Sequence, residues 1–204
     1  GDFPGNMEKA LKAIDYENFE TRRAEAAERG VLRGLGISNT VKKTSSPNLE
    51  SSSIRFDPSG TVTLIMGTIS HGQGHETVFK QIVCDRLGIE PSTIRYVQGD
   101  TDMVTYGRGT FNSRSMSIGG SAVALACDKT IAKATTIAAH LLEAAEADLE
   151  FEEGVFTVAG TDRSKTIIEV AKAAFSASAI PAEIEPGLNE IGTFTPQYWN
   201  WPTG

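Results

Sequence analysis

The chain has 204 residues, of which 40% are hydrophobic and 22% are charged, a composition typical of a globular protein that can bury a core. Lys and Arg number 19 against 26 Asp and Glu, so the net charge is −7. This argues against nucleic-acid or anionic-membrane binding, because both need a basic surface. No apolar run approaches the ~20 residues of a membrane span. The first residues also lack a signal-peptide core, so we expect a cytoplasmic protein.

The N-terminal part of the chain predicts a helix, a strand and a loop before the first turn. Residues 7–29 are rich in Ala, Glu, Lys and Arg and predict one solvated helix. Residues 31–44 predict a strand, and the polar stretch 44–53 predicts a loop. A turn of the hairpin kind at 57–60 then leads into a strand at 61–67, where apolar residues alternate with others.

The middle of the chain predicts a strand, a glycine-rich turn, a helix and another strand. The turn covers residues 67–77, and an amphipathic helix is expected over 76–88. A short strand follows at 93–98, which completes a βαβ-like unit. A second glycine-rich loop is predicted at 99–112.

The C-terminal half is dominated by an Ala-rich, helix-prone stretch at 113–149. Within it, Gly119 and Gly120 indicate either close helix packing or a break. A hairpin is predicted at 149–160 and a second amphipathic helix at 166–179. From Pro181 onward the sequence predicts irregular structure.

Together these elements predict an α+β fold, in which the strands of a mixed sheet pack against helices. We divide it into an N-terminal helix at 1–30 and an α+β body at 31–204. The chain begins and ends abruptly, so we expect one section of a longer polypeptide. Cys84 and Cys127 fall in helix-like apolar stretches and indicate buried free thiols, although the sequence leaves a disulfide between them open.

The turn at 67–77, GTISHGQGHET, carries the strongest sign of a binding function. Gly72 and Gly74 bracket Gln73, so the backbone can approach a ligand closely. The predicted helix that follows begins with amide groups that have no partner inside the helix. This arrangement favours a polar, phosphate-bearing cofactor.

The second loop ends in FNSRS, which places Ser113, Arg114 and Ser115 at the expected start of a helix. Two hydroxyls, a guanidinium and free helix amides can form an anion site. Simple capping of the helix by Ser113 or Ser115 is the alternative.

Common nucleotide and metal motifs do not account for these loops. The third glycine of a dinucleotide fingerprint is replaced by Thr77 in the first loop and by Asn112 in the second, and no P-loop occurs. His71 and His75 are four residues apart, but the glycines between them argue against a rigid helix that carries both as metal ligands. We assign no metal ligand and no catalytic residue in this chain.

The two loops resemble a known family. The segments GTISHGQGHETVFKQIVCDRLGI and GDTDMVTYGRGTFNSRSMSIGGSA are similar to the molybdenum-binding large subunit of the molybdenum hydroxylases. That group contains xanthine dehydrogenase, aldehyde oxidase and aerobic carbon monoxide dehydrogenase. The GQGHET and GTxxSRS forms, with RRAEAAERGVLRGLGIS, LEFEEGVFTVAGTDRS and EPGLNE in the same order, look closest to the carbon-monoxide-dehydrogenase-like branch.

The resemblance implies a molybdopterin site built from both loops. One set of residues would bind the pterin end of the cofactor, His75 through its backbone amide or ring: Gly72, Gln73, Gly74 and His75. A second set would bind further along the cofactor, at its phosphate part: Ser113, Arg114 and Ser115. In bacterial members of the family the cofactor is usually a cytosine dinucleotide form.

The resemblance also implies what this chain does not contain. The family's catalytic glutamate belongs to a motif beyond Gly204, and iron–sulfur clusters and FAD belong to partner subunits or domains. The intact enzyme would oxidise or hydroxylate a small substrate with water as the oxygen source. We expect the isolated chain to lack turnover and cofactor. The alternatives are a non-catalytic binding or assembly module that lost the cofactor and, with less support, a phosphate-ester hydrolase, for which no base or metal cluster is found.

Overall fold

The structure is a computed structural model that describes residues 2–38, 40, 42, 44 and 48–198. Contacts divide the chain into a smaller unit, Gly1–Thr44 with Trp199–Gly204, and a larger unit, Ser45–Tyr198. Each unit is described by itself. Among the described residues, no helix has the length and apolar character needed to cross a membrane.

The smaller unit contains two helices where the sequence predicted one. Helix α1 spans Phe3–Ala13, a short 3-10 turn, η1, spans Tyr16–Asn18, and α2 spans Phe19–Glu28. The prediction of a single helix over 7–29 is therefore wrong. Asp15 breaks the helix because its backbone is left-handed, with φ 54°, and the guanidinium of Arg22 donates to the carbonyl oxygens of Ile14 and Asp15 at 2.7 Å each.

The strand predicted over 31–44 is also wrong for the residues that are described. Residues 31–38 form no strand. Val31, Leu32 and Ile37 are 55%, 97% and 54% exposed, so their apolar side chains lack the packing partners on which strand preference depends.

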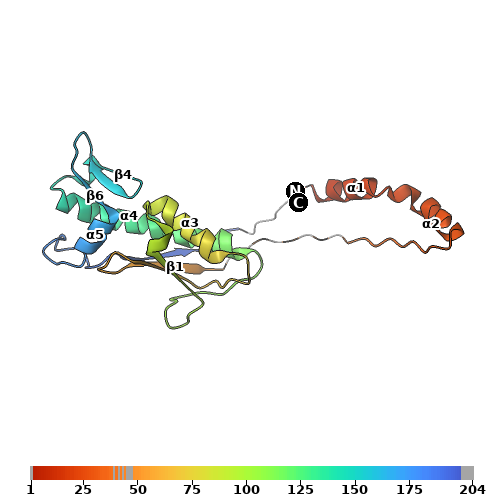
Figure 1. Cartoon of the computed structure of the whole chain (residues 1–204), viewed down its shortest axis with the longest axis horizontal. Helices are drawn as coiled ribbons and strands as arrows, with labels where there is room; N and C mark the ends of the chain where they lie inside the picture. The colour runs from red at the N-terminus through yellow and green to blue at the C-terminus, as the bar shows by residue number, and fades with distance from the viewer. Residues whose placement is uncertain (1, 39, 41, 43, 45–47, 199–204) are drawn as a thin grey trace. The chain divides into compact units, whose positions relative to one another are not determined.

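The larger unit is built on a four-stranded mixed sheet, which confirms the predicted α+β class (Figure 1). Its strands stand in the order β3-β2-β1-β7, with bounds β3 Ile94–Gln98, β2 Val62–Met66, β1 Glu50–Phe56 and β7 Asn189–Phe194. The β2–β3 pair is parallel, and β1 pairs antiparallel with both β2 and β7. The strand–helix–strand unit predicted from the sequence is thus confirmed, with a 3-10 turn, η2 (Pro91–Thr93), before β3.

Two strands occupy sequence that was predicted to be irregular. β1 begins at Glu50, inside the predicted loop 44–53, and four consecutive polar residues of this strand are buried, namely Glu50, Ser51, Ser52 and Ser53. β7 lies beyond Pro181 and pairs with β1. The sequence misses the start of β1 because Ser51 and one carboxylate oxygen of Glu50 find hydrogen-bond partners far away in the sequence, which hydropathy does not register.

Helices α3 and α4 lie along one face of this sheet (Figure 1). α3 spans His75–Leu87, with Gly88 after its end as predicted. The Ala-rich stretch forms a π-helical segment, η3 (Ser115–Gly120), followed by α4 (Ser121–Leu141). Both glycines at 119–120 are buried, and a Cβ on Gly119 would lie 3.3 Å from the Met66 side chain, so this pair permits close packing.

A small antiparallel sheet completes the larger unit. After η4 (Glu146–Asp148), it contains β4 (Leu149–Glu152), β5 (Val155–Val158) and β6 (Ser164–Thr166). The hairpin turn through Glu153 and Gly154 is confirmed, and both residues have positive φ. α5 spans Ile167–Ala173, shorter than the predicted 166–179, and Thr166 caps its start.

The two cysteines are free, as the sequence indicated. Cys127 is buried in the core between α4 and the sheet, and Cys84 on α3 is half-buried. Burial raises the pKa of the Cys127 thiol to about 12 and raises the pKa of Cys84 above its ordinary value. Both groups are therefore protonated, weakly reactive thiols at neutral pH.

Candidate cofactor-binding site

The first glycine-rich loop joins β2 to α3 and leaves its backbone open. Gly72 and Gly74 have positive φ, 100° and 75°, which explains why glycine is needed at both positions. A Cβ built on either residue would meet no other atom within 4 Å. The backbone beside Gln73 is therefore free to be approached from outside.

The start of α3 adds an electropositive element to this loop. Gly74 stands at the N-cap and supplies no side-chain cap, so the first-turn amides have no side-chain acceptor there. The helix runs for 13 residues, long enough to give its N-terminus a partial positive charge. This end of α3 suits an anionic or strongly polar group.

Gln73 has already used part of its hydrogen-bonding capacity. Its Oε1 accepts from the backbone N–H of His71 and from the hydroxyl of Ser70, the latter at 3.4 Å. Ser70 is held in turn by Gln98 at the end of β3, whose Oε1 accepts from the Ser70 N–H at 3.0 Å. What Gln73 offers a ligand is therefore its amide NH₂, a donor, rather than its carbonyl oxygen.

His75 is placed differently from the other residues predicted in this loop. Its side chain is buried, and its ring packs against Phe79 with 5.3 Å between the ring centroids. Burial lowers the pKa of His75, and the charge of His71 lowers it further, so the ring is neutral at neutral pH. The ring Nδ1 has no hydrogen-bond partner. The backbone amide of His75 lies in the first turn of α3, which has no side-chain cap.

The second glycine-rich loop approaches η3 through two strained residues. Asn112 and Ser113 both have left-handed backbone, with φ 50° and 53°. Ser113 is exposed, whereas Ser115, the first residue of η3, is 8% exposed. The Ser115 hydroxyl donates to Thr110 Oγ1 at 3.2 Å, so it is bonded within the loop.

Thr110 ties the two loops together. Its hydroxyl accepts from the Ile69 N–H at 3.1 Å and donates to the Ile69 carbonyl oxygen at 2.6 Å. With the Ser115 contact, this hydroxyl links the first loop to the start of η3. The sequence does not single out Thr110, because one threonine in a polar loop carries no motif. Through these bonds the two loops lie side by side.

Arg114 is the largest fully buried side chain in the part of the chain that is described. Its guanidinium pairs with the carboxylate of Glu50 and also donates to the carbonyl oxygens of Gly109 at 2.8 Å and Leu49 at 2.9 Å. It lies over the Phe111 ring, 5.2 Å from the centroid. The anion-binding role that the motif predicts for this side chain stays a prediction, because the terminal nitrogens are bonded to protein oxygens here.

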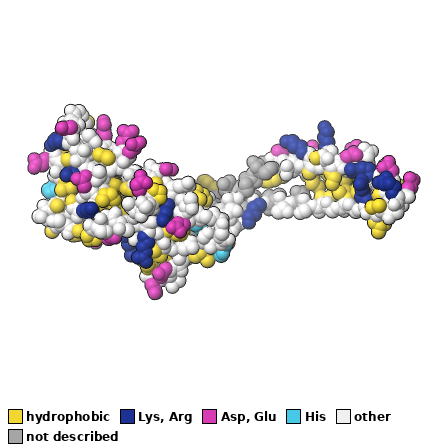
Figure 2. Space-filling view, in the orientation of Figure 1, with side chains coloured by type: hydrophobic (Ala, Val, Ile, Leu, Met, Phe, Trp, Pro, Cys, Tyr) yellow, Lys and Arg dark blue, Asp and Glu magenta, His cyan; other side chains and the backbone are white. Residues whose placement is uncertain are grey.

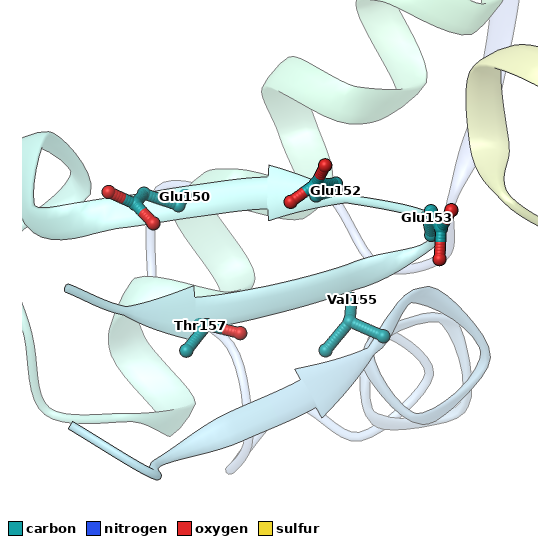
Figure 3. A pocket seen from close by; sticks show the side chains of 5 residues that line it. All are labelled: Glu150, Glu152, Glu153, Val155 and Thr157. Atoms are coloured by element: carbon teal, nitrogen blue, oxygen red, sulfur yellow. The ribbon is translucent and has the colours of Figure 1, made fainter. Parts of the chain in front are cut away.

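A hollow with an acidic lining lies on the small sheet (Figure 3). It is lined by residues of β4, β5 and their turn, namely Glu150, Glu152, Glu153, Val155 and Thr157. Acidic side chains gather over this part of the larger unit (Figure 2). Within the described residues, no group of three or more His, Cys, Asp or Glu could hold a metal ion. An anionic cofactor is therefore better matched to the glycine-rich loops than to this surface.

Comparison with known proteins also indicates a domain that binds a cofactor. A sequence profile of the molybdopterin cofactor-binding domain matches residues 9–204. The carbon monoxide dehydrogenase large chain of Hydrogenophaga pseudoflava is 37% identical over 221 residues, covering 100% of this chain and 27% of that protein. Subunit gamma of the 6-hydroxypseudooxynicotine dehydrogenase complex of Paenarthrobacter nicotinovorans is 34% identical, covering 100% of this chain and 26% of that protein.

The fold gives the same result. The structure of reconstituted CO dehydrogenase from Oligotropha carboxidovorans superposes with a TM-score of 0.74 at 36% identity, over 98% of this chain and 27% of that one. The chain thus spans about a quarter of the length of these relatives. It belongs to the molybdopterin cofactor-binding domain family, which confirms the resemblance inferred from the loop motifs.

Proposed function

We propose that this chain forms one section of the cofactor-binding part of a molybdenum hydroxylase large subunit. The observation that supports this best is the pairing of the two glycine-rich loops. One presents open backbone at Gly72 and Gly74 before an uncapped helix start, and Thr110 ties it to the other. When bound, molybdopterin with its molybdenum would supply two-electron oxidation of a small substrate, with water as the oxygen source.

In this proposal the chain binds and orients the cofactor rather than carrying out the reaction. The first loop offers the Gln73 amide NH₂ and the open backbone from Gln73 to His75, whereas the Gly72 N–H already donates to Ser70 Oγ at 3.3 Å. In the second loop, exposed Ser113 offers a hydroxyl close to the start of η3, while Ser115 and Arg114 shape the loop from inside. Donors at both places suit an anionic cofactor with a phosphate-bearing arm.

The proposal extends to the identity of the cofactor and to partners. We infer a cytosine dinucleotide form, iron–sulfur and FAD-binding subunits or domains that receive the electrons, and a cytoplasmic location. We further expect the purified 204-residue chain to have no turnover by itself, because it spans only about a quarter of the length of its relatives and, among the described residues, no group of three or more His, Cys, Asp or Glu could hold a metal ion. Substrate-dependent dye reduction by this chain alone would contradict that expectation.

The test is metal and nucleotide analysis of the natural, full-length polypeptide. We expect molybdenum and, after acid hydrolysis, cytidine monophosphate in equal amounts. A pair of charge-matched variants locates the site. Gln73→Glu replaces the amide donor by a carboxylate and should lower the molybdenum content, whereas Gln81→Glu, at an exposed position of the same helix region, should not. If the wild-type protein contains neither molybdenum nor nucleotide, a non-catalytic binding or assembly module becomes the better description.

A further inference from the structure

Glu50 lies where the two glycine-rich loops cross. It is the first residue of β1, and its side chain is fully buried. One carboxylate oxygen, Oε1, lies against both loops: a Cβ on Gly67 would stand 2.4 Å from it, and a Cβ on Gly107 would stand 3.0 Å from it. The other, Oε2, accepts from the Arg114 guanidinium and from the Arg108 backbone N–H at 3.4 Å. One carboxylate therefore contacts the first loop and the second loop together.

Arg114 extends this contact to the far end of the second loop. It stands just before η3 and bonds the carbonyl oxygen of Gly109 within the same loop. It also bonds the carbonyl oxygen of Leu49, next to Glu50 in the chain. The ion pair therefore joins the start of β1 to both the middle and the end of the second loop.

The cost of burying this pair indicates that its role is positional. Both side chains are 0% exposed, so both charges are removed from water. A buried ion pair contributes little net stability compared with apolar side chains, whereas breaking one is strongly unfavourable. In addition, Oε1 of Glu50 and Nε of Arg114 have no hydrogen-bond partner. A core selected for stability alone has no need of such a pair at this place.

We propose that Glu50 and Arg114 are positioning residues that hold the two loops at the separation the cofactor requires. The identity of the ligand in this inference rests on the proposed function. The contact that we call the clamp, the Glu50–Arg114 ion pair with its bonds to the two loops, is a property of this chain itself. Neither side chain touches the cofactor in this proposal. Both act through the backbone of the loops, from Gly67 on one side and from Gly107 to Gly109 on the other.

The first measurement is hydrogen–deuterium exchange of the natural, full-length polypeptide without cofactor. The reporters are the Ile69 amide, which bonds Thr110, and the Tyr106 amide, which bonds Ser51 Oγ at 3.2 Å. Neither amide bonds Glu50 directly. In Glu50→Gln, we expect both amides to exchange at least about tenfold faster, because the loops separate locally once the charge pair is broken. The Ile167 amide, which bonds the Gly154 carbonyl oxygen, should not change.

Val170→Ala is the matched control, because it removes fully buried atoms from α5 without touching the loops. It should accelerate exchange at Ile167 and leave Ile69 unchanged. Arg114→Lys is a second variant that keeps a positive charge beside Glu50 but loses the fork that reaches two carbonyl oxygens. If Glu50→Gln does not fold, Arg114→Lys takes its place in the test and should likewise accelerate exchange of the Ile69 amide. Unchanged exchange at Ile69 in the variant that folds would overturn the proposal.

The second measurement is molybdenum and cytidine monophosphate content of the same variants. We expect Glu50→Gln to contain at least about tenfold less molybdenum and cytidine monophosphate than Val170→Ala. Loosened loops with unchanged cofactor content would overturn the link between the clamp and cofactor binding. If Glu50→Gln exchanges faster but the wild-type protein contains no molybdenum, the proposed function is refuted, whereas the role of Glu50 and Arg114 in holding the loops together is supported.

Discussion

Gly67→Ala is the substitution that tests the crossing of the two loops most directly. Gly67 does not have positive φ, so alanine introduces no backbone strain, and its cost is one of contact alone. The new Cβ would stand 2.4 Å from Glu50 Oε1 and 2.5 Å from the Gly107 Cα. Carbon atoms pack at roughly 3.5–4.0 Å, so the loops must separate by about 1 Å. Overpacking of this kind costs about 1–3 kcal/mol.

The assay is urea denaturation followed by far-ultraviolet circular dichroism, with Gly160→Ala as the reference. Gly160 has φ 73° and open space around its Cβ, so its substitution measures left-handed strain without contact. Gly107→Ala places a second methyl at the same crossing. The double variant Gly67→Ala with Gly107→Ala should then cost less than the sum of the single variants, by at least about 0.5 kcal/mol, because the loops separate only once.

Two results would refute this reasoning. A free energy of unfolding that changes by less than about 0.5 kcal/mol in Gly67→Ala would mean that the loops separate freely and are not clamped. Strict additivity of Gly67→Ala and Gly107→Ala would mean that the two methyls act in independent places. Gly67→Ala combined with the remote Gly160→Ala should be additive, which provides the internal control.

Three further predictions concern the supporting structure. Gly88→Ala should lower the free energy of unfolding, read from the urea midpoint, by more than about 1 kcal/mol, because its Cβ would lie 2.1 Å from the Gly154 nitrogen and its φ of 61° strains alanine; an unchanged midpoint would contradict both. Thr166→Ala should lower the free energy of unfolding by about 1 kcal/mol, because it removes the cap of α5. Hydrogen bonds from Thr166 lower the pKa of Glu169, so the difference in unfolding free energy between wild type and variant should become smaller in acid, where Glu169 is protonated. Burial raises the pKa of Cys127 from 9.0 to about 12, so the thiol should resist iodoacetamide in the folded protein. Its stabilising contribution should fall as the pH rises from 9.0 towards 12, because the unfolded chain loses the proton first, and Cys127→Ala should remove that part of the pH dependence.

The central strand–helix–strand unit could be predicted because each of its signals is local. Alternation marks β2, and apolar residues four positions apart, at Phe79, Val83 and Leu87, mark the buried row of α3. Gly88 marks the end of that helix, where its φ is 61°. Positive φ at Gly72 and Gly74 could also be expected, because glycine adopts this conformation without the steric cost that other residues incur. This part of the fold can therefore be predicted from neighbouring residues in the sequence, without knowledge of tertiary contacts.

The parts that could not be predicted depend on contacts between distant residues. The start of β1 reads as a polar loop, but Ser51 Oγ donates to the Tyr106 carbonyl oxygen at 2.5 Å across 55 positions of sequence. Glu50 finds Arg114 64 positions away. β7 likewise exists through its pairing with β1. In the smaller unit the error is different: helix propensity continues through Asp15, and the left-handed conformation of that one residue ends α1.

The glycines of the two loops illustrate why motif and structure give different information. In sequence, Gly67, Gly72, Gly74, Gly107 and Gly109 look alike. In the structure, Gly67 and Gly107 are glycines because another backbone and a buried carboxylate occupy the space of a side chain. Gly72, Gly74 and Gly109 have positive φ and nothing beside them. The first pair joins the loops to each other, and the second group leaves room for something outside the chain. A binding loop needs both kinds, because open backbone positions a ligand only if the loop itself is fixed.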